Sequence, residues 1–155
     1  MLISKSDIVS LAYITNIDDN LIKDEVINMV IQTYLVPVLT EAFYNEIMLD
    51  PNSYTALINT YIKPCIAFYV KYHLYTQHLF ETAQYSSPDP SKSPSLFSPA
   101  ISALIPNSVN RSVLRDIRFI AWQKEQLLRA HLISTTYDHY VKPSSNRICG
   151  FLVPH

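Results

Sequence analysis

Glycine is nearly absent from this chain of 155 residues, because Gly150 is the only one. Average usage of about 7% would give about eleven glycines. Tight β-hairpins and phosphate-binding loops depend on glycine, which adopts positive φ freely and lets a ligand approach the backbone. The shortage disfavours a β-barrel, a Rossmann domain and a P-loop enzyme. What remains is a set of helices joined by loops that do without glycine.

Charged residues and long apolar runs are also scarce. Charged residues make up 16% of the chain and apolar residues 48%, against a usual charged share of about 25%. The apolar share excludes disorder of the whole chain, and the length predicts a single domain with a real core. No window approaches 18 uninterrupted apolar residues, so no transmembrane span is expected. The low charge also indicates a surface that a partner covers in part.

Only two cysteines are present, and they lie far apart. Cys65 and Cys149 form neither a disulfide framework nor a CxxC pair. The first residues, MLISKSDIV, contain no long apolar segment, so no secretory signal is expected. A reducing cytosol is the default setting, in which both thiols pack as small apolar groups.

No spacing of polar residues points to catalysis or to a metal. His73 and His78 are five residues apart, and His131 and His139 are eight apart, whereas ligands on one helix face are three or four apart. The serines lack a GxSxG elbow. We therefore expect no catalytic residues, no metal and no cofactor. The histidines are expected to cap helices, to bond tyrosines or to contact a partner.

Apolar residues recur at helical spacing and predict an all-α bundle of about three to five helices. The expected helices are a short one opening at a Ser4/Asp7 capping box, one over 20–36 that Pro37 ends or kinks, one from Pro51 to about Ala83, and a last one from Arg111 to about Val141.

Two helix signals are more specific. Asp50 is expected to cap the helix that starts at Pro51, with Leu49 packing on Tyr54 as a hydrophobic staple. Pro64 predicts a kink or break near Tyr61.

Residues 85–110 interrupt the helical pattern with many prolines and serines. The segment still contains large apolar residues, namely Leu96, Phe97, Ile101, Leu104 and Ile105. It is either a docking arm for a partner or a cover over the domain's own core. We divide the chain into a helical domain over 1–141, which includes this loop, and a C-terminal tail over 142–155.

The tail carries an apolar patch close to the chain end. Its members are Ile148, Phe151, Leu152 and Val153. Apolar residues in this position are typical of a docking segment, although packing back on the parent domain is equally open.

The charge distribution is lopsided although the net charge is only −1, a value that disfavours a general nucleic-acid binder. Residues 1–110 hold five lysines and ten acidic residues, whereas residues 111–155 hold seven basic and three acidic ones. Arg111, Arg115 and Arg118 are spaced to share one helix face. This basic stripe either contacts phosphates or an acidic protein surface, or it is a solvated face with Asp116 and Glu125 as local partners.

The layout resembles the head–tail connector, or adaptor, proteins of tailed bacteriophages. The similarity rests on the opener ISKSDIV, on the segment YLVPVLTEAFYNEI, and on a long helix, a variable loop and a basic last helix, over roughly residues 1–141. The opener and first long helix are most similar to versions from phages of gut Bacteroidota, including crAss-like podoviruses. Some members have a glycine where this chain has Leu39-Thr40, and a more hairpin-like central loop.

The resemblance implies a structural, non-enzymatic protein of the virion neck, assembled in the host cytoplasm. It implies a ring of about twelve copies below the portal, joining capsid to tail around the DNA channel. The implied partners are the portal protein, other neck or tail proteins and, non-specifically, the DNA in the channel, but no membrane. Residues 142–155 would engage the portal or a neighbouring ring, and the basic stripe would line the channel or pair with an adjacent subunit. The residues by themselves leave an alternative, a small nucleic-acid-binding regulator that uses the last helix.

Overall fold

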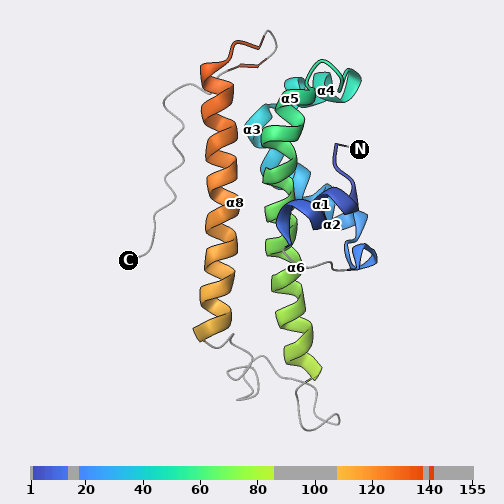
Figure 1. Ribbon diagram of the computed structural model, residues 1–155, viewed down its shortest axis with the longest axis vertical. Coiled ribbons are helices and arrows are strands. Elements are labelled where there is room, and N and C mark those ends of the chain that lie inside the picture. The colour runs from blue at the N-terminus through green and yellow to red at the C-terminus, as the bar shows by residue number, and fades with distance from the viewer. Residues whose placement is uncertain (1, 14–17, 86–107, 138–139, 142–155) are drawn as a thin grey trace.

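The computed structural model describes residues 2–13, 18–85, 108–137 and 140–141, and within these segments it is all-α, without a strand, as the sequence predicts. Figure 1 shows two long helices side by side, α6 (Lys63–Tyr85) and α8 (Ser108–Ser134), with the shorter helices packed around the upper part of this pair. Those shorter elements are α1 (Lys5–Ala12), η1 (Asp19–Leu21), α2 (Asp24–Val30), η2 (Ile31–Leu35), α3 (Val36–Leu39), α4 (Glu41–Leu49), α5 (Thr55–Leu57) and η3 (Ile58–Ile62).

Helix α1 begins at the capping box that the sequence predicts. The Asp7 amide donates to Ser4 Oγ at 3.1 Å, and the Ser4 amide donates to Asp7 Oδ2 at 3.1 Å. Lys63 Nζ lies 3.1 Å from the same carboxylate, which ties α1 to the start of α6. The hydrogen bond from the Ser4 backbone and the contact with Lys63 lower the pKa of Asp7.

The second helix starts later than the expected residue 20. Asp18 caps the short turn η1 by accepting from the Asn20 amide at 2.9 Å, and α2 begins only at Asp24. The capping side chain thus initiates one 3₁₀ turn, which ends at Ile22 in an extended conformation.

Both helix-interior prolines follow a π-helical turn. The Val36 amide donates to Ile31 O just before Pro37, and the Lys63 amide donates to Ile58 O just before Pro64. A π turn is wider than an α turn, so it makes room for a proline ring and for its missing N–H donor. Near Tyr61, where Pro64 predicted a kink or a break, the chain forms this π turn and the helix continues into α6.

The chain bends at Thr40 and not at Pro37. Helix α3 runs through Pro37 to Leu39, and Thr40 then adopts φ 70° and ψ 148°. The segments Asp24–Leu39 and Glu41–Leu49 meet at 108°. No single helix of the described residues is long and apolar enough to cross a membrane, and only this bent pair reaches the required length and hydropathy when the two parts are taken together.

The expected helix start at Asp50 is wrong. Residues 51–54 form turns in which the Tyr54 amide donates to Pro51 O at 3.2 Å, and the helix begins at Thr55. Leu49 is 87% exposed, so the hydrophobic staple does not form. Tyr54 packs instead against Phe43, with the ring centroids 5.4 Å apart.

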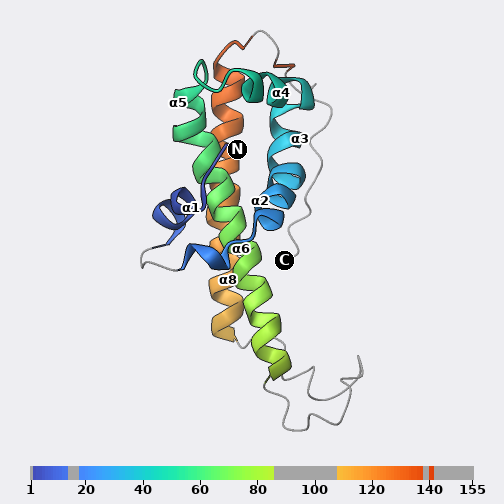
Figure 2. The same cartoon turned by 90° about the vertical axis from the view of Figure 1, so that its right-hand side faces the viewer.

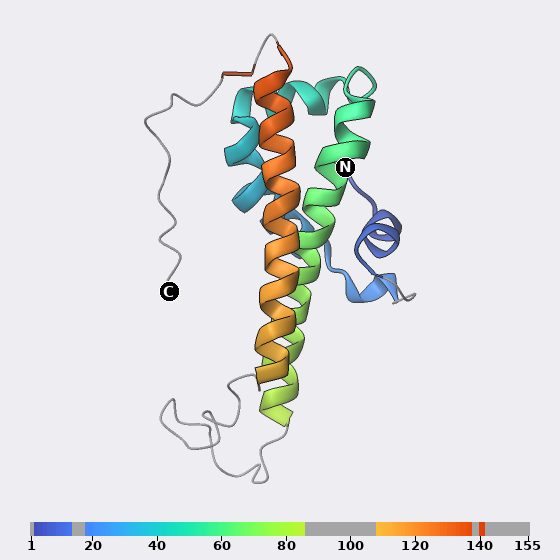
Figure 3. The ribbon, with the colours of Figure 1, turned by 60° about the vertical axis from the view of Figure 1, so that its left-hand side comes forward.

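The core lies on both sides of α6, which is the central helix (Figures 2 and 3). Helix α6 contacts α8, α1 and α2, and Figure 2 shows α1 and α2 on opposite sides of it. Ile66, Ala67 and Val70 of α6 are therefore buried together with Cys65 and Tyr69. A central helix buries side chains on more than one face, whereas a surface helix buries a single apolar stripe.

The last helix spans Ser108–Ser134, so it starts before Arg111 and ends well before Val141. The Thr135 amide closes the helix by donating to His131 O at 2.9 Å. Tyr137 and Tyr140 then fold over Phe43, with centroids 5.1 and 5.8 Å from its ring. Val113 lies one turn before the buried Ile117 but is itself 37% exposed.

Candidate functional site

The three arginines of the basic stripe are all exposed on α8. Arg115 Nε lies 4.0 Å from Asp116 Oδ1, and the two side chains are 81% and 67% exposed. An ion pair this long and this well solvated contributes little, so the stripe keeps most of its positive charge.

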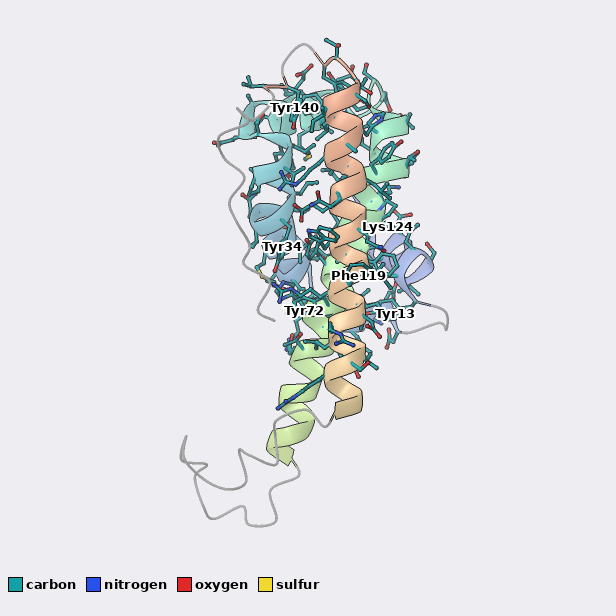
Figure 4. All side chains as sticks on the ribbon, turned by 90° about the vertical axis from the view of Figure 1, so that its left-hand side faces the viewer. Tyr13, Tyr34, Tyr72, Phe119, Lys124 and Tyr140 are labelled. Carbon is teal, nitrogen blue, oxygen red and sulfur yellow. The ribbon has the colours of Figure 1, made fainter. Side chains whose placement is uncertain are left out.

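Two aromatic residues extend this stripe. Phe119 follows Arg115 by four residues and Trp122 follows Arg118 by four, so each aromatic ring lies one turn from an arginine. Their rings stack with centroids 5.8 Å apart, and the residues are 53% and 50% exposed. Figure 4 shows Phe119 on the side of α8 that faces away from α6. We call Arg111, Arg115, Arg118, Phe119 and Trp122 the basic–aromatic face.

An acidic patch lies on the opposite side of α6. It comprises Asp18, Asp19, Leu21, Asp24 and Glu25, all of them exposed, and Leu21 is 64% exposed. These residues belong to η1, its cap and the first turn of α2, on the far side of α6 from α8 in Figures 1 and 2. The opposite charges of the two halves of the sequence therefore become two separated surfaces.

A buried polar cluster joins α6 to α8. Glu125 is only 9% exposed; its Oε2 accepts from the Tyr69 hydroxyl at 2.5 Å and its Oε1 from Arg129 Nε at 2.8 Å. Burial, reinforced by the bond to Glu125, raises the pKa of Tyr69, so its hydroxyl stays protonated and donates. The partners of Glu125 are Tyr69 and Arg129, so of the two local partners that the solvated-face alternative offers to the stripe, only Asp116 lies against one of its arginines.

The same cluster continues into the second helix through aromatic contacts. Tyr34 stacks on Tyr69 with centroids 3.9 Å apart and planes 11° apart, and its hydroxyl lies 3.1 Å from His73 Nε2. Burial lowers the pKa of His73, which favours the neutral ring. These contacts connect η2, α6 and α8, which are distant from one another in the sequence.

Two histidines bond tyrosines, as one of the sequence interpretations had it. His73 pairs with Tyr34, and His131 Nε2 lies 2.9 Å from the Tyr137 hydroxyl. The side chain of His78 and the whole of His139 lie outside the described residues.

The described side chains offer no activated nucleophile at Cys65 and no metal centre. Cys65 is buried, and burial raises the pKa of its thiol to about 12, so the thiol is protonated at neutral pH. Across the described segments, no group of three or more His, Cys, Asp or Glu side chains could hold a metal ion.

Two expected docking segments cannot be placed. The apolar residues of the loop lie outside the described residues, as do those of the tail: Leu96, Phe97, Ile101, Leu104, Ile105, Ile148, Phe151, Leu152 and Val153. Of the loop 85–110, Tyr85 ends α6 and residues 108–110 belong to α8.

Comparison with known proteins adds no relative. No protein-family model, no curated protein and no solved structure matches this chain.

The sequence predicted the arginines of the basic–aromatic face but missed Phe119 and Trp122. The signal was available, because neither residue falls on the inward stripe that includes Ile117, Ala121 and Leu128. A single exposed apolar residue is normal on a protein surface, but two adjacent aromatic residues beside arginines have the composition that is enriched at protein interfaces.

Proposed function

We propose that this chain is a structural subunit of the head–tail connector of a tailed bacteriophage. In this proposal it forms an oligomeric ring below the portal, joins the capsid to the tail and surrounds the DNA channel. It has no enzymatic role, and its partners are further copies of itself, the portal and other neck or tail proteins.

The basic–aromatic face is the observation that carries the proposal. Phe119 and Trp122 are half-exposed and stacked beside Arg115 and Arg118. Aromatic residues and arginine are enriched at the centres of protein interfaces, whereas in the free monomer about half of each of these two residues stays exposed to water. The all-α fold with opposite charges on its two sides suits a subunit made to contact neighbours.

The segments that carry the resemblance also fit the proposal in their local structure. ISKSDIV forms the capped start of α1, and YLVPVLTEAFYNEI spans the bend between α3 and α4. Thr40 lies at that bend with φ 70°, a value that favours glycine, and some connectors have glycine at this place.

The direct test is binding to the portal protein encoded in the same genome. Size-exclusion chromatography of the mixed proteins should give one complex that contains both. A monomer that elutes apart from the portal at every ratio would contradict the proposal, as would a genome without a portal gene.

A second candidate is a nucleic-acid-binding regulator, which the exposure of Arg111, Arg115 and Arg118 on one helix favours. It predicts an affinity for duplex DNA that falls steeply with salt and is lost when the three arginines become alanine. The connector is preferred because the same chain also carries an exposed acidic patch, which suits a protein partner and repels the phosphates of nucleic acid.

A further inference from the structure

We infer that the basic–aromatic face of one copy binds the acidic patch of a second copy, head to tail. This inference rests on the proposed ring, and it names the two surfaces that join adjacent subunits. The occupant of the face is thus another copy of this chain, and not DNA.

The charges of the two surfaces are complementary. Residues 111–118 contain three arginines and one aspartate, whereas residues 18–25 contain four acidic residues and one lysine. The acidic patch keeps most of its charge in the monomer, since the contact of Asp24 with Lys5 is 3.5 Å long and Asp24 is 58% exposed. Opposite charges on matching patches speed association and set the register of the two partners.

The apolar parts of the surfaces also match. Phe119 and Trp122 stand beside the arginines, and Leu21, 64% exposed, stands beside Asp18 and Asp19. A protein surface with both acidic and apolar groups can cover the whole basic–aromatic face. The backbone of duplex DNA could pair with the arginines only, and it would leave the aromatic rings in water.

The placement of the patches dictates the kind of assembly. The helix α8 and the η1 turn with the start of α2, which carry the two patches, lie on opposite sides of α6 (Figures 1 and 2), so a contact between two copies leaves one free patch of each kind. Such a heterologous contact continues into a closed ring or a filament. A symmetric contact of the face with itself would set arginines against arginines, which like-charge repulsion opposes.

Charge reversal tests the pairing. Arg115→Glu with Arg118→Glu reverses the basic–aromatic face, and Asp19→Lys with Glu25→Lys reverses the acidic patch. We expect each double variant to weaken self-association by roughly tenfold or more in sedimentation velocity, without a change in the circular-dichroism melt. Glu41→Lys with Asp50→Lys changes as much charge outside both patches and should leave self-association unchanged.

Mixing the two reversed variants is the decisive step. Each reversed face then meets a reversed patch, and each natural face meets a natural patch, so the mixture should assemble with the two variants alternating. A chain that carries all four changes should assemble alone. If the acidic-patch variant assembles like the natural chain, or if mixing restores nothing, the inference is overturned.

The outcomes separate this inference from the proposed function. A natural chain that stays monomeric up to millimolar concentration overturns the head-to-tail contact, whereas the connector role is judged by portal binding. If reversal of the arginines abolishes a salt-sensitive affinity for a short DNA duplex and leaves self-association intact, the face binds DNA and the inference fails.

Discussion

At the scale of single residues, Thr40 holds the least favourable backbone conformation of the described chain. It is the only non-glycine residue there with positive φ, and its Cβ is branched. Positive φ costs a residue with a side chain about 1–2 kcal/mol, and more where Cβ is branched. The Thr40 hydroxyl is also buried without a hydrogen-bond partner. Both features raise the free energy of the folded state at the bend that positions α4.

Thr40→Gly should therefore raise the free energy of unfolding by about 1 kcal/mol in urea titration, after allowance for the greater entropy of unfolded glycine. Thr40→Ala is the matched variant, because it removes the hydroxyl but keeps a Cβ. It should gain less than the glycine variant. An alanine variant more stable than the glycine variant would show that the backbone at Thr40 is not strained.

A second residue-scale prediction concerns pH and His73. Burial lowers its folded-state pKa below the ordinary 6.5, so the unfolded state binds its proton first. The contribution of the neutral His73 ring to the free energy of unfolding is fully present above pH 6.5. It decreases as the pH falls from 6.5 towards the lower folded-state pKa of His73. His73→Gln should flatten this part of the stability profile, measured by urea unfolding at a series of pH values.

Asp7 provides the contrasting pH window. Its lowered pKa contributes stability above the ordinary 3.8, and this contribution is lost only as the pH falls through the lower folded value. Asp7→Asn should thus change the profile below about pH 4 and leave its slope between pH 5 and 7 unchanged. A change of slope near pH 6 in this variant, or none in His73→Gln, would contradict the assignment.

At the scale of elements, the pairing of α6 with α8 depends on the buried carboxylate of Glu125. Tyr69→Phe removes one donor and should cost about 1–2 kcal/mol of unfolding free energy. Glu125→Ala leaves the Tyr69 hydroxyl and Arg129 without their acceptor and should cost about 3 kcal/mol or more. The double variant should cost clearly less than the sum of the two.

Gln126→Ala is the control for the α6–α8 prediction, since Gln126 is the exposed neighbour of Glu125 on the same helix. It should stay within about 0.5 kcal/mol of the natural chain. Strict additivity of Tyr69→Phe and Glu125→Ala would mean that the two side chains do not act as a unit.

The start of a helix could be predicted where it depends only on residues close together in the sequence. The capping box of α1 involves only Ser4 and Asp7, and the structure forms it as expected. The start at Asp50 was wrong because tertiary packing of Tyr54 on Phe43 outweighs a local staple with Leu49. The end of α8 was misjudged for the same reason, since Tyr137 and Tyr140 leave the helix to cover Phe43.

At the scale of the whole molecule, only half of the candidate site was visible in the sequence. The spacing of Arg111, Arg115 and Arg118 defined the basic stripe. The sequence did not predict that Glu125 would pair away from the stripe, because the carboxylate accepts a hydrogen bond from Tyr69 on another helix. The opposite placement of the acidic patch depends on how α1 and α2 pack on α6, which no local pattern encodes.

The aromatic pair should contribute to assembly and not to folding. Phe119→Ser with Trp122→Ser should abolish self-association, while the melting temperature of the monomer changes by only a few degrees. Leu127→Ser is the matched control, because Leu127 is 54% exposed on α8 but outside the basic–aromatic face. A melt that collapses in the aromatic variant, or a Leu127 variant that fails to assemble, would move the interface elsewhere.

The proposal that this chain is a ring-forming connector subunit is tested most directly by negative-stain microscopy of the chain mixed with the portal protein encoded in the same genome. The account predicts portal rings extended on one side by a second ring, with density that disappears when the chain is omitted. Bare portal rings beside free monomers, at saturating concentration of the chain, would contradict it.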